Sequence, residues 1–588
     1  VITRNQAHGS PGNLLDFYAK SDIPETEGRG IFRFKMASSA AHVSGKQLIS
    51  SETATWLNEH FLSSLADVKE DIDRYFLGGV NHIVYHGTAY SPQEEDWPGW
   101  LFYAAVHFNP QNSFWEHFRA LNRYVARVQS FLQSGKSDNE ILLYYPIHDI
   151  WSKLTGNLLI HFSGNIDPLF EGSVFKTAGE KMKERGYGFD YNSACQIQNV
   201  ETGQGVLRTG NATYHTLVLP QSDFIPLKTL EKIIELAEEG ATIISYQGLP
   251  QSFASYGDMD GKAEEWNRLI DKLQFGGTGR NDIREALTGK GRFLQGGNLE
   301  NLLKDAGIKR EPMTDIGLQF VRRSYEEGNI YCIKNSGEKN IDGWVPLSVK
   351  AQSLALFDPM KEISGYTNLK SEENGGVEVY FQLKQGASAI LKTNFSLVRN
   401  PSYKYVEKAG EPRKIGEKWT IRFVKGGPVV PEYIVIDELK SWTEFDGDEV
   451  KNFSGKAVYS ASFTMSGENY DGWLLDLGNV RHSAVVKLNG HNLDTLIGPN
   501  YQTLINKSSL KANNNELEIE VANLMANRIA YMDREEIPWK KFYNINFPAR
   551  FSENRNEAGL FDDSGWPPMD SGLTGSVTLN PIRWKGGF

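Results

Sequence analysis

The stretch "QLISSETATWLNEHF" (residues 47–61) puts a single carboxylate, Glu52, between a short apolar run and an amphipathic pattern. The first part is typical of a buried strand, and the second part is typical of a helix. Carboxylates are rarely buried without partners. Glu52 is therefore either a structural group with a partner or a catalytic group, and the neighbouring sequence has to distinguish the two.

Around this stretch, residues 1 to about 110 alternate strand-like runs with helical patterns. The strand-like runs are "VITRNQAHG" (1–9), "DIPETEG" (22–28), "QLISSE" (47–52) and "NHIVYHG" (81–87). The helix after residue 52 shows one apolar face, and Gly78 and Gly79 end it as a left-handed C-cap would. That face is formed by Leu57, Phe61, Leu65, Val68, Ile72 and Tyr75. This order predicts a parallel sheet with crossover helices.

Polar side chains cluster at the carboxyl end of each predicted strand. They are His8, then Glu25 and Glu27, then Glu52, and finally His86. In a (β/α)8 barrel that end is the catalytic face. Only about four of the eight units are visible, so we expect residues 1–137 to be the C-terminal half of such a barrel, with the first half preceding Val1.

The rest of the chain predicts three further domains. Residues 138–325 show buried strands and amphipathic helices without G-x-G-x-x-G, which favours a flavodoxin-like doubly wound α/β domain without a dinucleotide. Residues 326–434 alternate in the all-β pattern and predict a β-sandwich. Residues 435–588 predict a galactose-binding-like jelly roll, with a tight hairpin at Asn489–Gly490.

Composition excludes several classes of protein. The formal net charge is −11, and there is no basic cluster, which argues against a nucleic-acid partner. No apolar run reaches the roughly 20 residues that span a bilayer. Cys195 and Cys332 form neither a disulfide framework nor a metal-site spacing.

Carboxylates at the rim of a parallel barrel suit glycoside hydrolysis, which uses two of them. The aromatic and acidic run "YSPQEEDWPGW" (90–100) adds rings that could bind sugar faces. Each residue also has a structural interpretation: Glu52 could cap a helix or pair with an arginine, and Glu25 and Glu27 could be solvated. The two histidines could be satisfied rim groups, and Trp97 and Trp100 could be packing residues.

The segments "RNQAHGSPGNLLDFYAKSDIPETEG" (4–28), "SSETATW" (50–56) and "NHIVYHGTAYSPQEEDWPGW" (81–100) resemble the C-terminal half-barrel of the α-L-rhamnosidases of glycoside hydrolase family 106. The resemblance extends along the whole chain. It implies a calcium-dependent, inverting exo-hydrolase that removes terminal L-rhamnose from plant cell-wall polysaccharides. A periplasmic or secreted location follows from that substrate class.

By this resemblance Glu52 ends the seventh barrel strand and is expected to be the general base. Glu25 and Glu27 are the expected calcium ligands or contacts to sugar hydroxyls. His8, His86, Trp97 and Trp100 are expected to bind substrate, with Arg4, Asn5 and Gln6 as weaker candidates. The general acid would lie before Val1, so the chain by itself is expected to be inactive.

Two other functions stay open at this point. A different barrel glycosidase, such as a β-galactosidase, can have the same order of domains. A non-catalytic carbohydrate-binding protein is the second alternative, because the aromatic residues around "DDSGWPP" (562–568) could bind sugar without cleaving it.

Overall fold

The computed structural model describes residues 1–153, 167–255, 257–280, 282–373, 375–465, 469–542 and 547–586. It begins with a four-stranded parallel sheet whose strands lie in chain order, as predicted. The strands are β1 (Arg4–Asn5), β2 (Ile23–Glu27), β3 (Ser50–Thr53) and β4 (His82–Tyr85). The intervening helices are α1 (Leu14–Tyr18), α2 (Ile31–Val43) and α3 (Leu65–Leu77), and α4 (Phe118–Leu132) follows β4. No helix in the described part of the chain is long and apolar enough to cross a membrane.

Helix α3 is shorter than the apolar periodicity predicts. It starts at Leu65, because Ser64 and Asp67 form a capping box that satisfies the first free N–H groups. Leu57 and Phe61 are buried in the irregular segment before it, so their spacing mimics a helical face without forming one. Gly79 takes the left-handed conformation (φ 93°) expected at the end of the helix.

The second part of the chain forms a seven-stranded sheet. Its five parallel strands lie in the order β7-β6-β11-β13-β17, which is the flavodoxin-like order 2-1-3-4-5. Two antiparallel strands extend the β17 edge. The seven strands are β6 (Ile141–Tyr144), β7 (Phe189–Asn192), β11 (Thr216–Pro220), β13 (Thr242–Tyr246), β15 (Gly276–Gly277), β16 (Arg284–Thr288) and β17 (Gly291–Gly296).

The β-rich remainder is divided differently from the predicted boundaries. The first large sheet already includes β5 (Lys136–Ser137) and β18 (Leu318–Tyr325), both before residue 326. Strand β26 (Lys404–Lys408) pairs with β38 (Thr578–Gly586), and β28 (Trp419–Gly427) pairs with β30 (Ser454–Phe463). The last β unit therefore starts well before residue 435. Alternation looks the same in both units and therefore cannot locate the boundary.

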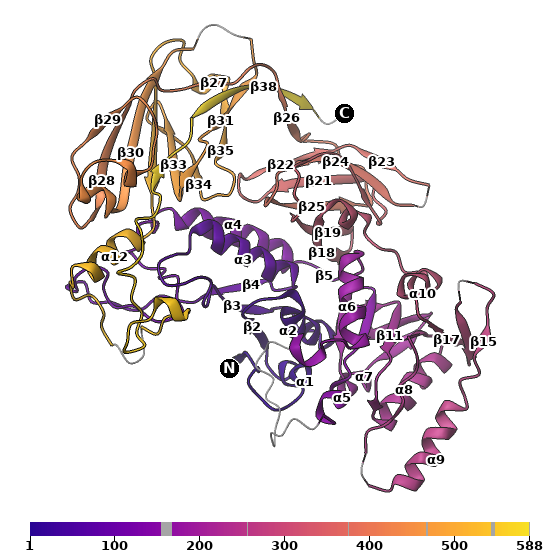
Figure 1. Ribbon diagram of the computed structural model, residues 1–588. Helices are drawn as coiled ribbons and strands as arrows, with labels where there is room; N and C mark the ends of the chain where they lie inside the picture. The colour runs from indigo at the N-terminus through magenta and orange to yellow at the C-terminus, as the bar shows by residue number, and fades with distance from the viewer. Residues whose placement is uncertain are drawn as a thin grey trace.

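A segment near the C-terminus returns to the N-terminal part of the molecule. Helix α12 (Ala526–Arg534) and the chain directly after it lie beside the loops that follow β3 and β4 (Figure 1). The carboxylate of Glu59 accepts hydrogen bonds from the backbone of Arg550 and Phe551 and from Asn554 Nδ2, at 3.0–3.1 Å. Residues almost 500 positions apart are joined by this contact.

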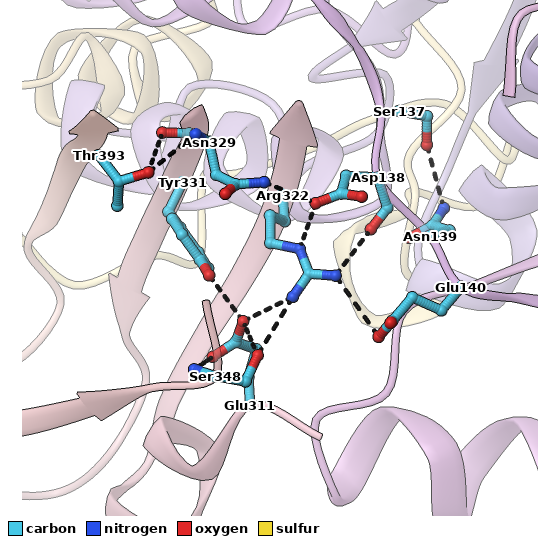
Figure 2. Close-up of polar contacts among 10 residues, drawn as sticks. All are labelled: Ser137, Asp138, Asn139, Glu140, Glu311, Arg322, Asn329, Tyr331, Ser348 and Thr393. Atoms are coloured by element: carbon cyan, nitrogen blue, oxygen red, sulfur yellow. Dashed lines mark hydrogen bonds and ion pairs between the residues drawn. The ribbon is translucent and has the colours of Figure 1, made fainter. Parts of the chain in front are cut away.

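Arg322 on β18 holds the α/β part and the first β sheet together. Its guanidinium donates to Asp138 Oδ2 at 2.6 Å and to Glu311 Oε1 at 2.7 Å, and Glu140 Oε2 lies 3.5 Å away (Figure 2). Tyr331 also donates to Glu311. Glu311 is buried, so its charge depends on these partners.

Replacing Arg322 by Met should weaken this junction by about 3–5 kcal/mol, because a buried carboxylate would be left without its partner. Hydrogen exchange should become faster in β18 and around residue 138. Arg208→Met, at an exposed arginine of β9 (Val206–Thr209), is the matched control. Equal exchange in the two variants would contradict this role of Arg322.

A second buried contact joins the start of α4 to the last β unit. The fully buried His117 ring contacts Ser483 Oγ at 2.8 Å and Glu520 Oε1 at 3.3 Å. The hydrogen bond from His117 lowers the pKa of Glu520 to about 2; burial opposes this effect, and Lys456 adds to it. Glu520, on β36 (Asn515–Ala522), is therefore held in its charged form.

The stability that Glu520 supplies should be present above its ordinary pKa of 4.5 and disappear as the pH falls toward about 2. Glu520→Gln should accordingly lower the melting temperature at pH 7, through a loss of up to about 3 kcal/mol, and cause little difference near pH 2. Melting curves across this pH range test the prediction. Glu518→Gln, two residues earlier on the strand, is the control. If the melting temperatures of both variants depend on pH in the same way, the role assigned to Glu520 is wrong.

Candidate active site

Glu52 lies at the carboxyl end of β3 and is held by three neighbours. Gln6 Nε2 donates to its Oε2, and the Thr55 hydroxyl donates to its Oε1, both at 2.6 Å. His86 Nδ1 lies 3.2 Å from the same Oε1. The side chain is still 28% exposed, so solvent reaches a carboxylate whose orientation is fixed.

Glu27 lies directly opposite Glu52 in the register of β2 and β3. His8 Nε2 lies 3.0 Å and Arg33 Nη2 3.3 Å from Glu27 Oε1. The hydrogen bond from His8 lowers the pKa of Glu27 against the effect of burial, with help from the charge of Arg33. The Arg33 guanidinium places a positive charge beside the Glu27 carboxylate.

Glu25 points to the same side of β2 but is more deeply buried, with 9% of its side chain exposed. Its Oε2 accepts from Arg4 Nε at 3.0 Å and from Ser50 Oγ at 2.8 Å. Asn5, also at the end of β1, accepts from the backbone of Ala7. Of the weaker candidates, only Gln6 reaches Glu52.

His86 has a defined hydrogen-bonding arrangement. Its Nε2 faces the backbone oxygen of Tyr103 at 3.2 Å. A carbonyl only accepts, so Nε2 carries a proton. The other ring nitrogen, Nδ1, then faces Glu52, and a protonated ring would place a positive charge beside that carboxylate.

Trp97 and Trp100 lie farther along the loop after β4 and pack against the C-terminal segment. The Trp97 indole donates to Gln111 O, and the guanidinium of Arg528 lies 3.9 Å above its ring. The Trp100 ring meets Phe542 edge to face. One face of the Trp97 ring is thus already covered, whereas substrate binding by either residue stays a prediction.

The sequence analysis missed several residues at this site, among them Arg33 beside Glu27 and Ser50 beside Glu25. Thr55 holds Glu52, and Phe102 packs its ring 5.7 Å from that of His86. The Tyr75 hydroxyl lies 3.1 Å from the backbone oxygens of Gly28 and Glu52, at the ends of two strands. The short distance in sequence between Thr55 and Glu52 could have indicated their contact. Tyr75 could not have been identified, because in the sequence it looks like any other apolar residue of the helix.

Comparison with known proteins shows the family to which the chain belongs. A family model described as alpha-L-rhamnosidase, that of glycoside hydrolase family 106, matches residues 16–365, which is more than half of the chain. The chain belongs to this family. The expected resemblance to the α-L-rhamnosidases of glycoside hydrolase family 106 is therefore confirmed.

A solved rhamnosidase from Novosphingobium sp. PP1Y has the same fold. It matches 96% of this chain and 52% of its own with a TM-score of 0.74 and 23% identity. A curated protein of Formosa agariphila, provisionally named beta-glucuronidase, is 28% identical over 312 residues, covering 52% of this chain and 23% of its own length. The chain thus spans about half of the rhamnosidase and less than a quarter of the curated relative.

A beta-galactosidase from Bacillus circulans sp. alkalophilus is much less similar. It has a TM-score of 0.39 and 9% identity, over 65% of this chain and 61% of its own. That score is too low for comparing the two sites.

The family resemblance implies calcium, for which Glu25 and Glu27 are the expected ligands. Calcium takes about six to eight oxygen ligands. Both carboxylates already accept from Arg, His or Ser side chains. Across the described ranges no group of three or more His, Cys, Asp or Glu side chains could hold a metal ion. Glu25 and Glu27 therefore do not fit a calcium site of their own, and calcium dependence stays a prediction.

If the implied dependence holds, a chelator should abolish rhamnosidase activity and added calcium should restore it. The measurement is rhamnose release from an aryl rhamnoside after treatment with the chelator, with magnesium in place of calcium as the control. Undiminished turnover in the chelator would exclude a calcium requirement.

Proposed function

We propose that the chain carries part of the active site of an inverting exo-α-L-rhamnosidase, with Glu52 as the general base. The observation that supports this proposal is the orientation of Glu52. Its carboxylate is held by Gln6, Thr55 and His86 at the carboxyl edge of a parallel sheet, yet remains accessible to solvent. A base needs both a fixed direction and access to water.

In this proposal β1 to β4 are four of the eight strands of a (β/α)8 barrel, and their carboxyl edge is the catalytic face. The strands that complete the barrel would carry the general acid. Glu27 is not suitable for that role, because it lies directly opposite Glu52 on the neighbouring strand. An inverting pair stands about 6.5–9.5 Å apart to leave room for the attacking water.

The residues around Glu52 then have distinct tasks. Glu52 removes a proton from a water molecule as its oxygen attacks the anomeric carbon of rhamnose, while the acid protonates the departing glycosidic oxygen. Gln6 and Thr55 fix the direction of the carboxylate. Arg33 balances the charge of Glu27 and His8 contacts the same carboxylate oxygen, so that Glu27 can accept a hydrogen bond from a sugar hydroxyl.

The substrate class proposed from the resemblance is a rhamnose-containing plant cell-wall polysaccharide or an oligosaccharide derived from it. A periplasmic or secreted location suits such a substrate. The proposed binding role of His86 is supported by its contacts with both Glu52 and Phe102. For the last β unit we propose a jelly roll.

Glu52→Gln should lower kcat on an aryl α-L-rhamnoside by about 10²–10⁴-fold in the intact enzyme, because the amide cannot accept the proton from water. The substitution should leave the fold unchanged, because a glutamine has the same shape and can still contact Gln6 and Thr55. A melting curve checks this. Glu231→Gln, on the exposed face of α8 (Leu227–Glu238), is the control.

Two results would contradict the assignment. Near-normal turnover of Glu52→Gln would remove Glu52 from the role of base. NMR of the first product should show the β anomer of L-rhamnose, and release of the α anomer would show retention instead of inversion.

A further inference from the structure

The loop after β3 receives two guanidinium groups from opposite ends of the sequence. Arg29, two residues after Glu27, donates through Nη2 to the backbone oxygen of Leu57. Arg550, in the C-terminal segment, donates through Nη1 to the backbone oxygen of Trp56. The backbone oxygens of two consecutive residues, Trp56 and Leu57, thus accept hydrogen bonds from two different arginines.

These two arginines are close enough to repel one another. Burial lowers the pKa of Arg550 and the positive charge of Arg29 lowers it further, whereas the charge of Glu59 acts in the opposite direction. Arg29 is exposed, and Arg550 is partly exposed. Repulsion between like charges is unfavourable unless an anion can lie between them.

The acidic groups nearby are buried and have other partners. Glu59 accepts from the backbone of Arg550 and Phe551 and is only 3% exposed. Asp71 is 4% exposed, and burial raises its pKa to about 6, although Arg74, the Ala54 N–H and Arg29 act in the opposite direction. Both carboxylates are buried, whereas Arg29 is exposed and Arg550 is partly exposed, so an anion in solvent can approach the two guanidinium groups.

The arginine pair is adjacent to Glu52. The Tyr75 hydroxyl lies within hydrogen-bond distance of two backbone oxygens, that of Glu52 and that of Gly28, which is the residue before Arg29. The Trp56 N–H donates to Ala104 O at 2.7 Å, which ties the same loop to the segment that carries Phe102. Phe102 is 38% exposed and packs against His86. An exposed ring and two cations therefore lie on the segments that follow the strand ends of the candidate site.

We propose that Arg29 and Arg550 bind an anionic group on the sugar linked to the terminal rhamnose. This inference rests on the proposed function. Each guanidinium has five N–H donors in a planar fork that suits carboxylate and sulfate oxygens, and the contact to the loop carbonyl uses one of them. The preferred substrate is accordingly a rhamnosyl uronate or a rhamnosyl sugar with a sulfate ester, and Phe102 offers its ring to the apolar face of that second sugar.

The test compares three disaccharides with rhamnose at the non-reducing end: a rhamnosyl glucuronate, its carboxyl-reduced form, and that reduced form bearing a sulfate ester. The intact enzyme should favour one of the two anionic compounds over the neutral one by about 10- to 100-fold in kcat/KM. The preferred compound identifies the anion.

The variants separate charge from support of the loop. Arg29→Gln and Arg550→Gln keep a donor for the loop carbonyl but remove the charge, so each should reduce the preference about tenfold or more. Arg29→Lys and Arg550→Lys keep the charge and should retain part of it. Arg555→Gln is the matched control: this exposed arginine lies in the same segment and donates to Ala549 O at 3.1 Å.

Three outcomes bear on the inference. No preference in the unmodified enzyme, or equal losses on the anionic and neutral disaccharides in the Gln variants, would overturn it and leave the arginines as supports of the loop. If no disaccharide is hydrolysed, the proposed function fails, and calorimetric binding decides the inference separately. Tighter binding of an anionic disaccharide that depends on both arginines would support it, and equal binding of all three would reject it.

Discussion

The arrangement of the candidate site depends on one constraint: parallel strands end at the same edge of their sheet. Glu27 and Glu52 are directly opposed in the register of β2 and β3, and Gln6 and His86 follow the two outer strands. Side chains from four separate segments therefore converge on one carboxylate. Tyr75 reinforces the convergence by holding two strand ends through their backbone oxygens.

Buried charges connect this edge to the rest of the molecule. Arg322 joins the α/β part to the first β sheet, and His117 joins the start of α4 to the last β unit through Glu520. Glu59 then anchors the segment around residue 550 to the loop after β3. The segment around residue 550 is thus fixed against the loop after β3, which explains how Arg550 reaches the backbone oxygen of Trp56.

Much of the fold could be predicted because it is local. The alternation of strands and helices predicted the parallel sheet, and both residues of the Asn489–Gly490 turn have the positive φ that a tight hairpin requires. The prediction failed where local patterns are ambiguous. Leu57 and Phe61 continue a helical spacing in a segment that is not helical, because Ser64 and Asp67 cap the helix later. Strands before residue 435 join the last β unit although their alternation resembles that of the preceding sheet.

The sequence by itself determined the alternation of strands and helices around Glu52 and the strand end on which this residue lies, because periodicity reports local structure. The family followed from the resemblance of three segments to known α-L-rhamnosidases. Only the tertiary structure decided which groups surround that carboxylate. Gln6 rather than Arg4 bonds Glu52, Arg528 covers Trp97, and Glu25 and Glu27 are bound by other side chains. These choices depend on the register between strands and on contacts between residues far apart in the chain, neither of which a local pattern encodes.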